Sequence, residues 1–298
     1  MQLGFIGLGK MGLNMVTRLV QGGHHVVAYD RTAEPVARAA SVGCSGATGL
    51  EDLVGQLKSP RIVWLMVPSG APTEELVHKV SALLGPGDIL VDGGNSNFHD
   101  DVRRAAELQT TGIKYIDVGV SGGVWGLKNG YCMMVGGEQA TAEFLRPILT
   151  TLAPPNGWSY MGAAGAGHYV KMVHNAIEYS MMQGYAEGFE LMQKSEYNLD
   201  LGRIADLWMQ GSVIRSWLLE LTAGFLKENP KLDGIRGFVQ DSGEGRWTLL
   251  DAVDKAVPVP TLAAALFTRF RSRQEESFAE QMLASMRNAF GGHEIKRS

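Results

Sequence analysis

Short apolar segments alternate with stretches of helical character through the first half of the chain. The β-rich runs cover residues 2–6, 25–29, 61–67, 88–92, 114–118 and 131–135. This alternation is typical of βαβ units in a parallel sheet. The pattern therefore predicts a doubly wound α/β domain in this half of the chain.

The pattern changes in the second half. Beyond about Gly157 no strand-like run is expected, and Gly162–Gly167 leads into a proline-free segment at 166–194 that predicts one long helix. Further helices are predicted at 200–210, 213–228, 248–255, 260–272 and 275–290. We therefore expect an α/β domain over residues 1–162 and an all-α domain over residues 163–298.

Composition narrows the function classes. A chain of 298 residues with 45% hydrophobic and 19% charged residues suits two globular domains. No apolar run approaches the roughly 20 residues that cross a bilayer, and no secretory signal precedes Leu3, so we expect a cytoplasmic protein without a membrane partner. The net charge is −4 and no long basic run suggests a nucleic-acid surface, so we expect no nucleic-acid partner. An anionic substrate would need cations that are concentrated locally.

The two cysteines predict neither a disulfide framework nor a metal site. Cys44 and Cys132 are far apart and belong to no CxxC or Cys/His cluster. We expect two buried structural thiols and no metal.

A glycine motif directly follows the first predicted strand. Its residues, at the start of an amphipathic helix, are Gly7, Leu8, Gly9, Lys10, Met11 and Gly12. In this context the glycines permit a tight turn, a close approach to a pyrophosphate and tight packing of helix on strand. The helix N-terminus presents N–H groups to the anion. The motif therefore predicts a dinucleotide-binding Rossmann domain.

The second strand ends at an acidic residue that bears on cofactor choice. Asp30 lies at about the spacing at which an acid binds the adenosine ribose, and it would repel a 2′-phosphate. Arg31 beside it offers a phosphate partner, and Asp30 could instead be a turn residue. We predict NAD, with NADP as the alternative, and we place Arg31, Val67 and Asn95 among the cofactor contacts.

Four polar residues share one stripe of the predicted long helix. Lys171, His174, Asn175 and Glu178 are spaced i, i+3, i+4 and i+7. The residues between them, Met172, Val173, Ala176 and Ile177, are expected to pack into the core. Oxidation of an alcohol needs a base for the hydroxyl proton, and a lysine whose pKa is lowered by burial can serve. Lys171 is the candidate base. The alternative is that the polar stripe is a solvated helix face without a catalytic role.

Together these motifs resemble the 6-phosphogluconate dehydrogenases, in their shorter bacterial form. The resemblance covers essentially the whole chain and includes Asp92–Ser96, Gly119–Gly123, Lys171–Tyr179 and the tail around Phe290–Gly292. It implies oxidative decarboxylation of 6-phosphogluconate to ribulose 5-phosphate and CO2, in the pentose phosphate pathway and gluconate metabolism.

The resemblance also implies the role of each catalytic residue. Lys171 takes the 3-hydroxyl proton as hydride passes to the nicotinamide, and then polarises the keto group while CO2 leaves. Asn175 holds the substrate, and Glu178 protonates C1 of the enediol. The residues that hold the sugar acid would be Asn95, Ser121, Gly122, Gly123, His174 and Asn175.

The phosphate group would be bound by Tyr179, Arg246 and Arg287, where longer relatives carry lysine at the position of Arg246. Arg287 and His293 would come from the tail of a neighbouring subunit, which implies a homodimer or homotetramer built by the helical domain. The residues Arg269, Arg271 and Arg273 crowd one predicted helix, and the sequence does not select among them.

Two alternatives stay open at this point. A related β-hydroxyacid dehydrogenase, such as one acting on 3-hydroxyisobutyrate, shares the Ser-Gly-Gly turn and the Lys-x-x-x-Asn pair, but it would not need the phosphate-binding cations. A nicotinamide-sensing protein without turnover would have no use for a lysine, an amide and an acid on one helical stripe.

Overall fold

The computed structural model describes residues 1–297 and divides the chain into two compact units, Met1–His174 and Asn175–Ser298. The first unit is built on one sheet with the order β3-β2-β1-β4-β5-β6-β7-β8. Its strands are β1 (Gln2–Ile6), β2 (His25–Tyr29), β3 (Ser45–Gly46), β4 (Ile62–Leu65), β5 (Ile89–Asp92), β6 (Lys114–Ser121), β7 (Cys132–Gly137) and β8 (Trp158–Gly162). All neighbouring strands are parallel except β6 and β7. This topology confirms the predicted α/β fold.

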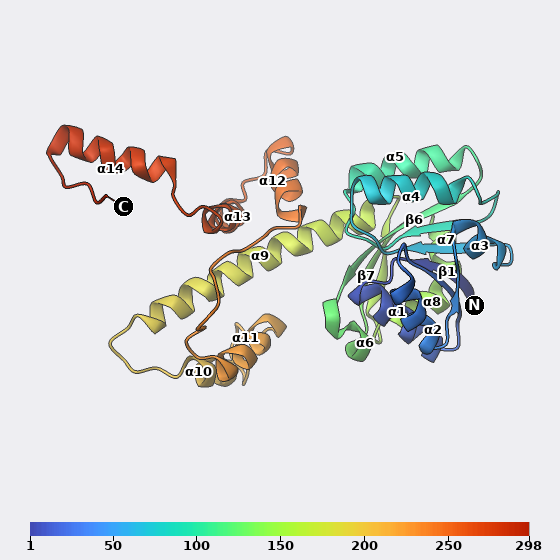
Figure 1. The fold of residues 1–298 in the computed structure, drawn as a ribbon, viewed down its shortest axis with the longest axis horizontal. Helices are drawn as coiled ribbons and strands as arrows, with labels where there is room; N and C mark the ends of the chain where they lie inside the picture. Colours follow the sequence, from blue (N-terminus) through green and yellow to red (C-terminus); the bar gives the residue numbers. More distant parts are fainter. Residues whose placement is uncertain (298) are drawn as a thin grey trace. The chain divides into compact units, whose positions relative to one another are not determined.

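Helices cover both faces of the sheet (Figure 1). One core packs β-strand side chains against α1 (Lys10–Gln21), α2 (Ala33–Ser41), α7 (Gln139–Phe144) and α8 (Arg146–Leu152). The other packs them against α3 (Leu50–Gly55), α4 (Ala71–Ser81) and α5 (Phe98–Gln109). The chain runs from β1 outward to β3 and then returns to β4 on the other side of β1, so the carboxyl ends of β1 and β4 flank the switch point at which such sheets bind ligands.

Three expectations for this unit were wrong in detail. The strands β3 and β8 were not predicted, and β8 falls in the segment after Gly157 that was expected to lack strands. Its residues alternate between partly buried and exposed, as on a sheet edge, so it has no continuous apolar run to reveal it. Cys44 is buried as expected, whereas Cys132, the first residue of β7, is exposed.

The second unit is helical in its described residues. Helix α9 (Ala166–Gln193) begins in the first unit and continues into the second, where α10 (Leu201–Trp208), α11 (Trp217–Glu228), α12 (Glu244–Asp254), α13 (Pro260–Ser272) and α14 (Phe278–Gly291) follow. One small core joins α9 to α12 and α13, and another joins α9 to α10 and α11. Helix α14 buries none of its own residues. Among the described residues, no helix is both long and apolar enough to cross a membrane.

Candidate active site

The glycine motif forms a cradle at the carboxyl end of β1. Gly7 has φ +98, and a Cβ added there would lie 2.3 Å from the Met66 carbonyl oxygen, so no other residue fits. A Cβ on Gly12 would lie 2.0 Å from the Gly7 oxygen, whereas one on Gly9 would meet nothing within 4 Å. Gly9 is also the N-cap of α1 and provides no side-chain cap. The helix N-terminus thus opens onto space beside a glycine, which fits a dinucleotide pyrophosphate.

Asp30 has a structural role, and the alternative of a turn residue describes part of it. Its Oδ2 accepts a hydrogen bond from the Leu8 backbone N–H at 2.9 Å, and its Oδ1 accepts from the Thr32 backbone N–H at 3.2 Å. The carboxylate therefore fixes the glycine loop from behind while Arg31 beside it is exposed. The ribose contact of Asp30 stays a prediction.

The loop after β5 is held from within by Asp92. This fully buried carboxylate accepts hydrogen bonds from the Gly94 backbone N–H at 3.0 Å and from Ser96 Oγ at 2.6 Å. A Cβ on Gly94 would lie 2.9 Å from the carbonyl oxygen of Val67, a residue that also flanks the glycine cradle. Asn95 stands exposed between buried neighbours. The loop is therefore anchored by the Gly94 backbone and the Ser96 side chain, and it presents the Asn95 side chain outward.

The first turns of α9 lie directly against the sheet. Asp117 on β6 accepts hydrogen bonds from the backbone N–H groups of Gly165 at 2.8 Å and His168 at 2.9 Å. A Cβ on Gly167 would lie 2.4 Å from the Met134 carbonyl oxygen, so glycine is needed for this close approach. A Cβ on Gly119 would lie 2.3 Å from the Cβ of Lys171.

Lys171 is consequently seated on β6 and is only 6% exposed. Its Nζ lies 3.4 Å from His174 Nδ1. Two residues beyond Gly119, β6 ends at Ser121, where the turn continues with Gly122 and Gly123, which both have positive φ. Because β1, β5 and β6 run in the same direction, their carboxyl ends share one edge of the sheet. The first unit thus assembles Lys171, Asn95, the Ser-Gly-Gly turn and the glycine cradle along this edge.

The remaining residues of the stripe lie in the second unit. Asn175 is 8% exposed and donates from Nδ2 to Glu244 Oε1 at 3.0 Å, while Glu178 is half-buried. Burial of Lys171 and Asn175 rules out a solvated helix face. Met172 and Ala176 are buried as expected, but Ile177 is 56% exposed, so its expected place in the core was wrong.

Two hydrogen bonds link Tyr179 of α9 through the exposed Ser242 to Glu244, the first residue of α12. Tyr179 accepts a hydrogen bond at its phenol oxygen from the Ser242 backbone N–H at 3.2 Å, and Ser242 Oγ donates to Glu244 Oε2 at 2.6 Å. Glu244 is itself 2% exposed and was not predicted from the sequence. The sequence signal that could have identified Glu244 is its position in the Gly243–Arg246 segment, two residues before Arg246.

The three arginines of α13 have different partners in the structure. Arg269 lies over the Tyr179 ring, with its Cζ 3.6 Å from the ring centroid. Arg271 is paired with Glu280, and Arg273 with Asp241. Arg269 follows Leu262, Ala265 and Leu266 on the buried face of the helix, and this periodicity could have identified it.

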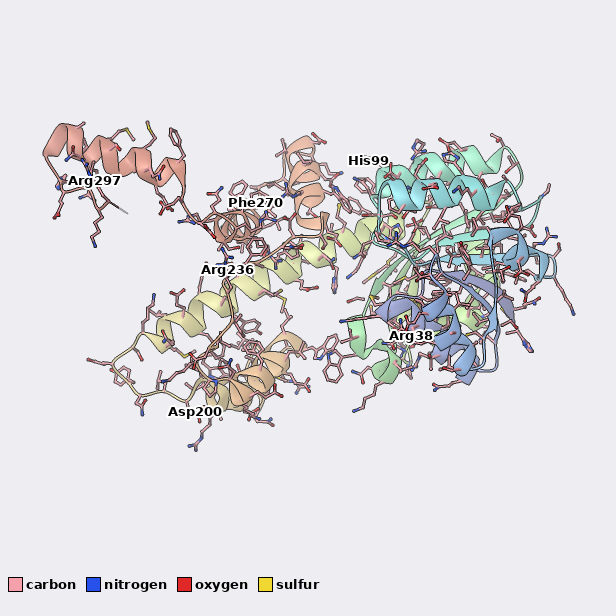
Figure 2. The ribbon with its side chains drawn as sticks, viewed as in Figure 1. Arg38, His99, Asp200, Arg236, Phe270 and Arg297 are labelled. Atoms are coloured by element: carbon pink, nitrogen blue, oxygen red, sulfur yellow. The ribbon has the colours of Figure 1, made fainter. Side chains whose placement is uncertain are left out.

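Arg246 and the C-terminal cations have different surroundings. Arg246 donates to both carboxylate oxygens of Asp241, at 2.6 and 3.2 Å, and its Cζ lies 4.4 Å above the ring of Phe270, labelled in Figure 2. Arg287 and His293 are exposed, on α14 and just after it. The contribution of these two residues to a neighbouring site stays a prediction.

Comparison with known proteins agrees with this geometry. Residues 2–165 match the model of the NAD binding domain of 6-phosphogluconate dehydrogenase, and residues 167–298 match the model of its C-terminal domain. An NAD(+)-dependent, decarboxylating 6-phosphogluconate dehydrogenase of Haloferax volcanii is 43% identical over 299 residues, which cover 100% of this chain and 99% of the relative.

Solved structures show the same fold. The 6-phosphogluconate dehydrogenase of Plasmodium falciparum has a TM-score of 0.84 at 30% identity, covering 100% of this chain and 66% of that one. A 3-hydroxyisobutyrate dehydrogenase of Mycobacterium tuberculosis has a TM-score of 0.72 at 24% identity, covering 89% of this chain and 90% of that one. The second likeness concerns the fold alone.

Proposed function

Because the chain belongs to the 6-phosphogluconate dehydrogenase family, we infer that it oxidises and decarboxylates 6-phosphogluconate to ribulose 5-phosphate and CO2 with reduction of NAD. This is the oxidative, CO2-releasing step of the pentose phosphate pathway. The observation that carries the proposal is the buried Lys171, seated on Gly119 at the same sheet edge as the glycine cradle. In this position Lys171 would serve as the proposed base beside the proposed cofactor site.

The cofactor accepts a hydride when bound, and the chain supplies every proton transfer. The Nζ of Lys171 removes the proton from the substrate 3-hydroxyl as the C3 hydride leaves. The resulting ammonium donates a hydrogen bond to the 3-keto oxygen, so the electron pair of the breaking C1–C2 bond can move onto that oxygen as CO2 leaves. We propose that Glu178 then protonates the former C2 of the substrate, which becomes C1 of ribulose 5-phosphate, and that the lysine ammonium passes the proton taken from the 3-hydroxyl to Glu178, so that no net proton is released.

Binding roles follow from position. We propose that Asn95, the turn Ser121–Gly123, His174 and Asn175 hold the sugar acid. The cofactor residues are proposed to be Gly7–Gly12, Asp30, Arg31, Val67 and Asn95. A dianionic phosphate needs convergent cations, because the whole chain carries a net charge of −4.

For the phosphate we propose Tyr179, Arg246 and Arg287, and we add Arg269 because it already lies over Tyr179. Arg287 would act from a second subunit, together with His293, in a dimer or tetramer. Helix α14 exposes an apolar stripe that suits burial in such an assembly: Phe278 (76% exposed), Met282 (44%), Leu283 (58%) and Met286 (47%). The domain boundary after residue 162 and a cytoplasmic location also remain proposals.

One assay tests the proposal against its rivals. Purified protein is incubated with NAD or NADP and with either 6-phosphogluconate or 3-hydroxyisobutyrate, and the reduced nicotinamide is measured by absorbance. We expect turnover with 6-phosphogluconate and NAD. Turnover only with 3-hydroxyisobutyrate would support the related hydroxyacid dehydrogenase, and turnover with neither acid would support a sensor.

A further inference from the structure

A buried histidine joins the two elements that carry the candidate site in the first unit. His168 is 1% exposed. Its Nδ1 lies 2.7 Å from Asp101 Oδ2, and its Nε2 lies 2.9 Å from the Gly94 carbonyl oxygen. A carboxylate and a carbonyl oxygen only accept hydrogen bonds. Both ring nitrogens therefore need a proton, and the side chain is an imidazolium.

The surrounding charges favour this charged form. Burial alone would lower the pKa of His168, but the carboxylates of Asp101, Asp92 and Asp117 raise it to about 10. These groups lie on α5, β5 and β6, the elements packed around the ring. Tyr115 donates from its hydroxyl to Asp101 Oδ1 at 2.8 Å, and burial together with these carboxylates raises its pKa, which keeps it a neutral donor.

The same cluster could be taken for a metal site, since Asp92, Asp101 and His168 bring ligand atoms within 4.8 Å of one another. However, the Arg104 guanidinium lies 3.3 Å from Asp92 Oδ2 and 4.0 Å from Asp101 Oδ1. A buried arginine cation already balances these carboxylates, and a metal ion beside it would be repelled. The cluster is complete without a metal.

We propose that His168 is a positioning residue, which holds the loop carrying Asn95 at a fixed distance from the helix carrying Lys171. The proposal rests on the proposed roles of those two residues. Gly94, whose carbonyl accepts the His168 hydrogen bond, immediately precedes Asn95, and His168 precedes Lys171 by one helical turn. One ring thereby sets the spacing between a substrate-binding amide and the base.

Two substitutions of His168 each retain one of the two hydrogen bonds of the ring and remove the other. In His168→Gln the side-chain amide nitrogen reaches about as far as Nε2, so a donor to Gly94 is retained. In His168→Asn the amide nitrogen lies near the Nδ1 position, so a donor to Asp101 is retained and the Gly94 bond is lost. Both variants remove the positive charge, so any effect of charge on stability is shared. His24→Asn, at another buried histidine of the first unit, serves as the control for burial.

The first readout is hydrogen exchange of the loop 93–96 in protein without substrate or cofactor. We expect faster exchange in His168→Asn than in His168→Gln and the wild type, with His24→Asn unchanged. This readout is independent of the reaction, so it distinguishes failure of the positioning role from failure of the proposed function. Equal exchange in the two His168 variants would overturn the proposal.

The second readout is steady-state turnover with NAD and 6-phosphogluconate. We expect kcat of His168→Asn to fall roughly 10- to 100-fold below that of His168→Gln, because a displacement of about 1 Å has that effect on a reacting geometry. The KM for NAD should change little. Parallel losses of kcat in the two variants, scaling with their Tm, would reduce His168 to a purely structural residue.

Discussion

Helix α9 passes through two contrasting environments. Its first part, up to His174, is seated on glycines of the sheet, and His168 and Lys171 are buried there. Its second part exposes Ile177, Met181 and Leu191 by 56%, 40% and 75%. The contrast shows that the first part of the helix holds the candidate base Lys171 in a fixed position within the first unit. The residues proposed to bind the phosphate, Tyr179, Arg246 and Arg287, lie in the second unit, where helix α14 is exposed.

The largest effect is expected from removing the base. Lys171→Met keeps the length and apolar stem of the side chain, so packing on Gly119 should survive. We expect kcat to fall by about 10²- to 10⁴-fold, the usual contribution of general base catalysis, with NAD affinity unchanged by titration calorimetry. The exposed Lys194→Met is the control. Retention of wild-type kcat in Lys171→Met would remove this residue from the mechanism.

The next effect tests the close packing of the first part. In Gly167→Ala the new Cβ would lie 2.4 Å from the Met134 carbonyl oxygen. We expect the free energy of unfolding to fall by about 1–3 kcal/mol and kcat to fall with it, since Lys171 is displaced. Gly184→Ala, in the same helix with nothing within 4 Å of the new Cβ, should instead stabilise by about 1 kcal/mol. Denaturant unfolding measures both; similar behaviour of the two variants would refute the contrast.

The arginines of α13 sharpen the comparison on the recognition side. Arg269→Ala should raise the KM for 6-phosphogluconate by about 10- to 100-fold, since a hydrogen bond to a charged group contributes about 1.5–3 kcal/mol. Arg271→Ala, which breaks an exposed pair with Glu280, should leave KM near the wild-type value.

Arg287→Ala, on α14, is also expected to raise the KM for 6-phosphogluconate. If Arg287→Ala lowered only kcat, the phosphate assignment would be wrong.

A smaller effect is expected at the cofactor loop. Asp30→Asn retains an acceptor for the Leu8 N–H and removes the negative charge. We expect the preference for NAD over NADP, measured as the ratio of kcat/KM values, to fall by about tenfold. An unchanged ratio would mean that Asp30 acts only on the glycine loop.

The last effect concerns pH and the buried imidazolium. The pKa of His168 is raised to about 10 in the folded state, against about 6.5 unfolded. Its contribution to stability is therefore complete below about pH 6.5 and is lost as pH rises toward about 10. The difference in Tm between the wild type and His168→Gln should shrink steadily across this range. A constant difference would show that the ring is neutral.

Much of the fold follows from local pattern. The glycine motif between a strand and a helix predicted the Rossmann domain, and α13 begins and ends where the sequence pattern indicated. The edge strand β8 was missed because its side chains are only partly buried. The strand β8 is formed by its parallel pairing with β7, and its own residue pattern does not indicate a strand.

The candidate site was predicted less completely than the fold. The spacing of Lys171 and Asn175 placed them on one helical face, but the role of Glu244 depends on a contact 69 residues away in the chain. His168 likewise acquires its partners from α5 and the loop after β5, 67 and 74 residues away. Such distant contacts have no periodicity in the sequence, so local reasoning could not find them.

The central claim is that one helix serves both oxidation and loss of the carboxyl group. It is tested most directly with 6-phosphogluconate labelled in its carboxyl carbon, by measuring labelled CO2 and reduced NAD in the same reaction. The account predicts one CO2 for each NAD reduced. Reduced NAD without CO2 would contradict it, because the enzyme would then be an ordinary hydroxyacid dehydrogenase.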